Sequence, residues 1–370
     1  MENTLNKYRI QTQLNKQLRI LIEKEKFEAI GEIVKLLQNG ADPNHRPKYS
    51  HSLICTVLYS WPRESVAAGV KLLTSFGANV NLPDGSGHPA YSVCLKNNYP
   101  VEILNLLLTK GAVPIKNSIK DFEFSDVSVR DGRTNPEKVT DAFYAHMVAT
   151  GARATKAGKS RYNVTSKKNK IKYYKKEFEE LTKKAKAGKL SGELAVGFFK
   201  YMARGYPKWC NNRFGSSFHF LEDGTMIQIG GEHEDFYDPD FNIYNDVIKI
   251  TPSGGVELFL YPKHIFPPTD FHSSTKFVNK IIIIGGLGYQ KDRLTGQTNM
   301  FVLNLDDFSI KSLSSSGDKP GWIFEHTALL DEHNNSLYLM DGEKWIDGKS
   351  VKNKTTYRFD LKKNKWKSMK

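Results

Sequence analysis

The sequence predicts a multidomain α+β protein with an α-helical repeat region first and an all-β repeat region last. Three apolar helical segments near the start each end in Gly-Ala, with the equivalent glycines at Gly40, Gly77 and Gly111. Three apolar runs near the end each finish in a glycine pair or its variant, at spacings of 55 and 56 residues. We therefore expect a helical domain at 1–114, a basic, mostly helical connecting region at 115–207 and a β domain at 208–370.

The helical copies read KLLQNGADPN, KLLTSFGANVN and NLLLTKGAVP, with a period of 37 and then 34 residues. A recurrence of this length is typical of stacked units that cannot bury their apolar faces alone. Glycine takes the left-handed conformation that ends a helix without strain at Cβ. The copies resemble the ankyrin repeat, so an ankyrin solenoid is expected. The resemblance implies that His51 and His88 tie the turn backbone together rather than bind a ligand.

The β copies read MIQIGG, IIIIGG and LYLMDG, and a second strand follows each one: IYNDVIKI, NMFVLNL and TTYRFDL. A short apolar run suits a strand buried on both faces, and paired glycines suit close approach of another backbone. Asp223-Gly224 and Asn334-Asn335 are expected as hairpin turns. In the third copy Asp341 replaces the first glycine. These copies resemble the kelch motif, in which each copy forms one four-stranded propeller blade.

Three blades are fewer than the four to eight with which propellers close, so the resemblance implies a kelch-like propeller or partial propeller. Three arrangements would cover its open ends. An irregular fourth blade would lie in the connecting region, two three-blade arcs would close as a homodimer, or the arc would pack against the helices or a partner. We favour covering by the helices or a partner.

The net charge of the chain is +14, and it is concentrated in one segment that starts within the connecting region. Between Gly151 and Arg213 there are 18 Lys or Arg residues against four Glu. A helix is expected to begin near Pro136, with Val139, Phe143, Met147 and Val148 on one face. A later lysine-rich helix interleaved with aromatic residues indicates either an anion-binding surface or, as we favour, a solvated amphipathic helix. The candidate anion-binding residues are Lys167, Lys168, Lys170, Lys172, Lys175 and Lys176.

The cellular compartment is predicted from segments that the sequence does not contain. No apolar stretch approaches the ~20 residues of a membrane helix, and the N-terminus has no apolar signal-peptide core. No membrane span is therefore expected, and the expected location is the cytoplasm of the producing cell or of a host cell. Cys55, Cys94 and Cys210 are widely spaced and are expected as buried, reduced thiols.

The sequence contains no pattern that predicts catalysis, a cofactor or a metal site. Gly158-Lys159-Ser160 ends like a phosphate-binding loop, but Arg153 stands where that loop needs glycine. The acidic stretch at 232–240 has oxygen donors for a hard cation, yet a solvated loop explains its spacing better. We therefore expect a protein that is not an enzyme.

The repeats favour a non-catalytic protein–protein interaction module, such as a scaffold, an adaptor, a host-directed effector or a toxin-immunity protein. By resemblance, a protein partner would contact the ankyrin turn tips and the kelch loops. The expected contact residues are Asp42, Asn44, His45, Arg46, Asn79, Asn81, Asp84, Glu234, Asp235, Tyr237, Gln290 and Trp322. The alternative is a nucleic-acid-associated protein that uses the basic segment at 151–213.

Overall fold

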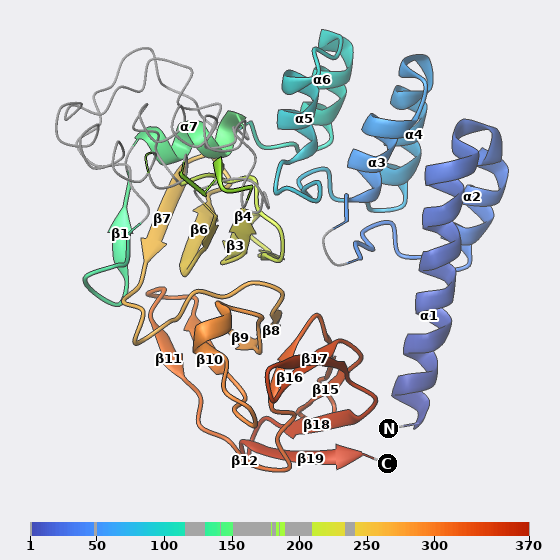
Figure 1. Ribbon diagram of the computed structural model, residues 1–370. Helices are drawn as coiled ribbons and strands as arrows, with labels where there is room; N and C mark the ends of the chain where they lie inside the picture. The colour runs from blue at the N-terminus through green and yellow to red at the C-terminus, as the bar shows by residue number, and fades with distance from the viewer. Residues whose placement is uncertain are drawn as a thin grey trace.

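The computed structural model describes residues 2–47, 50–114, 130–140, 142–150, 179, 183–184, 186–188, 209–233 and 241–369. These ranges form an N-terminal helical part and a C-terminal all-β part (Figure 1). In the described ranges the β part contains several antiparallel sheets, none of which closes into a barrel. The predicted order of helices before strands is confirmed.

The helical part consists of three helix pairs around one apolar core. Leu18, Ile22, Ile33 and Leu37 of the first pair are buried in that core, as their helical spacing predicts. The pairs are α1 (Glu2–Ile20) with α2 (Ile30–Gln38), α3 (Leu53–Ser60) with α4 (Arg63–Ser75), and α5 (Ala90–Lys96) with α6 (Val101–Thr109). A π-helical turn (Leu21–Glu25) and a 3₁₀ turn (Lys26–Ala29) join the first two helices.

Each pair ends at one of the three predicted glycines. Gly40, Gly77 and Gly111 have φ of +90°, +88° and +86°, and a Cβ at each would meet no atom within 4 Å. The requirement for glycine therefore comes from the left-handed backbone and not from crowding. The alanine after each glycine donates its N–H back into the last helical turn, which satisfies a terminal carbonyl.

Side-chain amides link each turn to the next. Asn44 donates to the Gly77 carbonyl at 2.9 Å and accepts from the Asn79 N–H at 2.7 Å. Asn81 repeats this pattern with the Gly111 carbonyl and the Val113 N–H, at 2.9 and 2.8 Å. The two asparagines hold successive helix pairs in one stack.

The β part contains three large sheets. Sheet 1 has the order β1 (Glu137–Val139), β7 (Val256–Leu260), β6 (Asp246–Ile250), β3 (Met226–Ile229), β2 (Ser217–Phe220). Sheet 2 has the order β11 (Ile310–Ser312), β10 (Met300–Asn304), β9 (Lys280–Ile284), β8 (Ser273–Phe277). Sheet 3 has the order β12 (Ser316–Gly317), β19 (Lys365–Met369), β18 (Thr356–Asp360), β15 (Ser336–Met340), β14 (Thr327–Asp331).

Smaller elements complete the β part. A three-stranded sheet contains β13 (Trp322–Phe324), β16 (Glu343–Ile346) and β17 (Lys349–Lys352). A two-stranded sheet pairs β4 (Glu232–His233) with β5 (Asn242–Ile243), and a 3₁₀ turn spans Gln290–Asp292.

The three large sheets are stacked in the order of the chain. Because strand side chains alternate between two faces, β9 sends Ile281 and Ile283 to a core shared with sheet 1, and Ile282 and Ile284 to a core shared with sheet 3. This explains why the apolar run of β9 is continuous rather than alternating. Adjacent first strands are also linked, since His219 Nε2 lies 2.7 Å from Ser274 Oγ.

The glycine pairs lie where neighbouring backbones meet. A Cβ at Gly230 would come within 2.4 Å of the Thr269 carbonyl oxygen, and one at Gly285 within 2.1 Å of the Ile323 oxygen. Thr269 and Ile323 each belong to the chain that leads into the following sheet. The prediction that glycine is needed there for backbone approach is confirmed.

The prediction that a helix begins near Pro136 is wrong about where the helix begins. Glu137–Val139 forms β1, which adds to the edge of β7, and α7 (Ala142–Thr150) follows it. The expected apolar face is otherwise correct, since Phe143, Met147 and Val148 are fully buried. They pack with Trp209 in a core shared with sheet 1, so α7 covers one face of that sheet. The strand forms because the edge of β7 offers backbone partners that the local sequence does not reveal.

Candidate functional site

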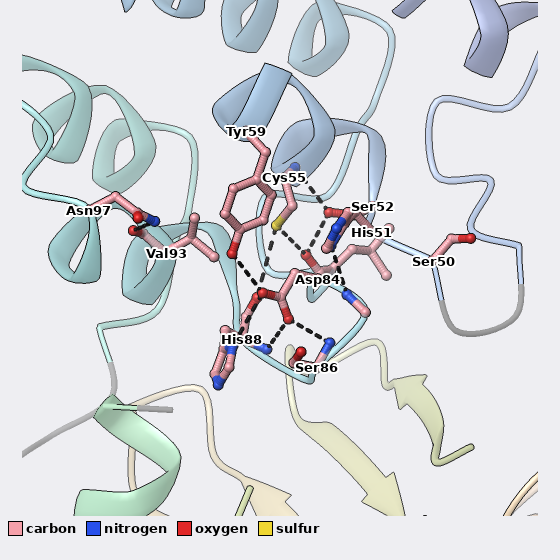
Figure 2. A network of polar contacts seen from close by, with 12 residues as sticks. Ser50, His51, Ser52, Cys55, Tyr59, Asp84, Ser86, His88, Val93 and Asn97 are labelled. Carbon is pink, nitrogen blue, oxygen red and sulfur yellow. Dashed lines mark hydrogen bonds and ion pairs between the residues drawn. The ribbon is translucent and has the colours of Figure 1, made fainter. Parts of the chain in front are cut away.

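The loop between α4 and α5 is organised around the carboxylate of Asp84 (Figure 2). Asp84 Oδ1 accepts the backbone N–H groups of Ser86 at 2.8 Å and His88 at 2.9 Å. Asp84 Oδ2 accepts the Tyr59 hydroxyl at 2.8 Å and lies 3.1 Å from His88 Nδ1. A short loop with an Asp that accepts N–H groups two and four residues ahead is locally encoded.

Asp84 is nearly inaccessible to solvent, with 2 % of its surface exposed. Burial by itself would raise the pKa of its carboxyl group, but hydrogen bonds from His88 and Tyr59 and the charge of His88 lower the pKa well below its ordinary value. The carboxylate is therefore ionised and fully used in holding the loop.

His51 and Arg46, which precede α3, complete the network around Asp84. His51 Nδ1 accepts the Gly85 N–H at 3.0 Å, and Arg46 donates to the Asp84 carbonyl at 2.8 Å. The expectation that a histidine side chain ties turn backbone together is confirmed for His51, whereas the His88 imidazole contacts the Asp84 carboxylate instead. Burial raises the pKa of Cys55 far above its ordinary value, so its thiol stays protonated in the folded protein. The Asp84–His88 pair has the geometry that orients an imidazole, but both residues are closed to solvent.

This loop docks on sheet 1 and its preceding segment. The Arg213 N–H donates to the Ser86 carbonyl at 3.3 Å, and a Cβ at Gly87 would lie 3.2 Å from the Asn211 carbonyl oxygen. Gln228 of β3 is equally near Gly87, with its Nε2 3.3 Å from that Cβ position. The guanidinium of Arg46 lies over the Phe218 ring, 4.8 Å from its centroid. The helix-pair turns are therefore bound by the chain's own β part.

A buried ion pair supports the β side of this contact. Arg213 and Asp246 are fully buried and joined through both guanidinium nitrogens, with Arg213 Nη2 2.9 Å from Asp246 Oδ2. Trp209 Nε1 also donates to Asp246 at 2.8 Å, and the Tyr244 ring lies 3.4 Å from the guanidinium carbon. These contacts fix the backbone that receives the helical loop.

The structure corrects two expected contact residues. Asp84 was expected on an exposed turn tip, but it is buried because its carboxylate organises the loop. Trp322 was expected on a surface loop, but its ring is 6 % exposed and its Nε1 donates to the Leu287 carbonyl at 3.1 Å. Gln290 is exposed, as expected.

Other expected contact residues have structural roles or lie outside the described ranges. Asp42, Asn44, Asn79 and Asn81 hold turn backbone through their side chains, and all four are half-buried. His45 is half-buried, and burial lowers its pKa. The residues outside the described ranges are Glu234, Asp235, Tyr237, Lys167, Lys168, Lys170, Lys172, Lys175 and Lys176.

Sequence reasoning did not identify the β side of this site. Arg213 and Asp246 are separated by 33 residues, and neither belongs to a recognisable motif. The available signal was the position of Arg213 directly before the first β copy, where the charge of a basic segment obscured it.

Comparisons with known proteins add no identification. No protein-family model matches the chain, and no curated protein matches it significantly. Within the described ranges, no helix is long and apolar enough to cross a membrane, and no group of three or more His, Cys, Asp or Glu side chains could hold a metal ion.

Proposed function

We propose that this chain is a non-catalytic protein-binding repeat protein, with an ankyrin-like stack joined to a kelch-like partial propeller. The repeated glycine ends and asparagine links of the helix pairs support the first part. The three stacked sheets with glycines at their junctions support the second. Repeat arrays of both kinds offer broad rigid surfaces suited to protein recognition.

The observation that carries this proposal is an exposed apolar stripe on α6. Val101 is 60 % exposed and Leu108 is 40 % exposed, with partly buried Leu104 between them on the same helix face. α4 contacts α6, so a further helix pair would be expected to cover α6 in a longer stack. In the described part of the chain α6 is the last helix of the stack, and the stripe is the surface where a helix from a partner would pack.

The helix-pair turns leave less surface available to a partner than the resemblance implies. Arg46 and the loop around Asp84 are occupied by sheet 1. The proposed contact surface therefore moves from those turns to α6, whereas Asp42 and His45 follow α2 in the first helix pair.

The test is capture of complexes by tagged full-length protein, with Val101→Asp and Leu108→Asp as variants. Val278→Asp is the matched control, because Val278 is 77 % exposed and lies on the β8–β9 turn. We expect a discrete protein to be recovered by the wild type and the control and lost by both α6 variants. Equal recovery by all four proteins would contradict the α6 surface.

Nucleic-acid binding is the second candidate, and it rests on the concentration of 18 basic residues against four acidic ones between Gly151 and Arg213. Neutralising several phosphates makes affinity fall by orders of magnitude as salt rises. Nuclease treatment during capture separates the candidates. A partner protein that survives nuclease supports the first, and recovery that collapses with nuclease supports the second.

A further inference from the structure

The outer face of sheet 3 contains a cavity of about 450 Å³. Strands β18 and β19 form one wall, and their antiparallel register places Arg358 opposite Lys367 and Asp360 opposite Lys365. Tyr357 and Phe359 point to the core shared with sheet 2, so Arg358, which lies between them, faces the other way. Figure 1 shows these strands beside the C-terminus, at the end of the stack of sheets.

Close backbone contact forms another wall of the cavity. β12 runs parallel to β19, and a Cβ at Gly317 would lie 2.1 Å from the Trp366 carbonyl oxygen. Gly317 also has φ of +84°. Any other residue at this position would push β12 away from β19 and open the cavity.

The charges around the cavity are unequal. Four cationic side chains line it, from Arg358, Lys363, Lys365 and Lys367, against the carboxylates of Asp318 and Asp360. Asp360 Oδ1 accepts the N–H groups of Lys362 and Lys363, at 3.0 and 2.9 Å. Asp318 Oδ2 accepts the Ser368 hydroxyl at 3.2 Å. Each carboxylate thus accepts from neutral donors through one of its two oxygens.

The Lys363 N–H and the charges of Lys363 and Arg358 lower the pKa of Asp360, so these two cations act on that carboxylate without closing an ion pair. Among the described residues, none of the four forms an ion pair with a carboxylate within 4.0 Å. Arg358 is half-buried, and its Nε donates to Ser336 Oγ at 3.0 Å, which fixes the guanidinium plane. The terminal nitrogens of a guanidinium held this way can bind two oxygens of one phosphate group.

We propose that this cavity binds a small phosphate-bearing ligand, with Arg358 as the anchor and Lys363, Lys365 and Lys367 as surrounding charges. The volume lies within the range of small-molecule sites. A net excess of two cations favours a multiply charged phosphate over a single carboxylate. This site is distinct from the α6 surface and does not depend on the proposed protein partner.

The test is a calorimetric titration of the full-length protein with inorganic triphosphate at low salt. We expect saturable binding that weakens at least tenfold in Arg358→Gln and in the double variant Lys365→Gln/Lys367→Gln. The control is Lys349→Gln/Lys352→Gln, which removes two exposed lysines from β17 and should change affinity less than twofold. Arg358→Lys keeps the charge but loses the planar fork, and should bind at an intermediate strength.

Three results would overturn the proposal. The first is absence of triphosphate binding, and the second is unchanged affinity in folded Lys365→Gln/Lys367→Gln, whose side chains are exposed. The third is a single-stranded oligonucleotide that binds through these same residues more tightly than triphosphate, which would make the cavity part of a nucleic-acid surface. Thermal unfolding of each variant verifies that it is folded.

Discussion

At the residue scale, Asp84 shows how one buried charge can organise a loop. Its carboxylate takes part in four contacts, with Ser86 N, His88 N, the Tyr59 hydroxyl and His88 Nδ1. The loop then presents Ser86 and Gly87 to sheet 1. Loss of this carboxylate would leave buried donors without acceptors, which costs more than the lost bonds alone.

We therefore predict that Asp84→Ala lowers the free energy of unfolding of the helical part by about 3 kcal/mol. Tyr59→Phe removes one of the four contacts and should cost about 1 kcal/mol. Glu102→Gln on the exposed surface of α6 is the control and should change stability by less than about 0.5 kcal/mol. Urea denaturation followed by circular dichroism at 222 nm measures all three, and a stable Asp84→Ala protein would contradict the role of the network.

The Asp84 carboxylate also makes the free energy of unfolding depend on pH. Because its folded pKa is lower than its unfolded pKa of about 3.9, its contribution is present above about pH 4 and is lost as pH falls further. The wild type should accordingly lose more stability below pH 4 than Asp84→Ala does.

His219 on β2 is a second residue with a defined pH effect. Burial, together with the charge of Lys276, lowers its pKa to about 4. The unfolded chain then binds a proton at higher pH than the folded chain, so stability present at pH 7 is lost as pH falls from about 6.5 to 4. We predict that His219→Gln removes about 2 kcal/mol of the loss between pH 7 and 4.5. Denaturant midpoints of both proteins across this range measure it, and parallel curves would contradict it.

At the element scale, the glycine pairs explain both the regular copies and the irregular one. The first glycine of a pair faces the chain leading into the next sheet, as Gly230 faces Thr269 and Gly285 faces Ile323. In the third copy that place is taken by Asp341, with φ of +59°. No further sheet follows sheet 3 in the described chain, so no neighbouring backbone has to approach this position. The third copy therefore needs a left-handed backbone here, but it does not need a residue without a Cβ.

Two glycines in the connection between β9 and β10 allow the cost of backbone conformation to be separated from the cost of crowding. Gly285 and Gly296 both have positive φ, of +71° and +83°, but only Gly285 is crowded. We predict that Gly285→Ala destabilises the β part by about 3 kcal/mol or more, through collision with the Ile323 carbonyl. Gly296→Ala should cost only about 1 kcal/mol of backbone strain. Thermal unfolding of the two variants compares them, and equal effects would show that crowding is not the cause.

At the scale of the whole molecule, the helical stack and the sheets form one connected body. Arg46 contacts Phe218, and the Ser86 carbonyl accepts from Arg213. We predict that Gly87→Leu, which drives a side chain toward Asn211 and Gln228, speeds hydrogen exchange both in the 83–89 loop and in β3. Gly77→Leu imposes a similar backbone strain at φ of +88° without a neighbour within 4 Å, and should leave β3 unchanged.

The exposed end of the stack of sheets, at sheet 3, determines whether two copies of the chain could close as a ring. A ring of two arcs would place a second copy against Asp341 and against the outer face of sheet 3, where Arg358 and Lys367 are paired across strands. A side chain at a glycine junction and a polar sheet face both oppose that closure. We predict a monomer of 42.0 kDa by light scattering at micromolar concentration. A stable dimer at this concentration would contradict the prediction.

The sequence by itself determined the features that depend on neighbours in the chain. Gly40, Gly77 and Gly111 mark helix ends because left-handed backbone is costly for other residues, and apolar periodicity revealed the helices and the buried strands. The apolar face of α7 was also readable, although its start was not.

Only the tertiary structure decided which segments meet. The Arg213–Asp246 pair, the docking of the Asp84 loop, the burial of Trp322 and the addition of β1 to β7 all join residues far apart in sequence or turn a polar residue inward. Such contacts form when distant surfaces match in shape and hydrogen-bonding groups, and one sequence contains no local signal of that match. The physical reason is that a residue's own backbone preference acts over a few neighbours, whereas burial depends on the whole chain.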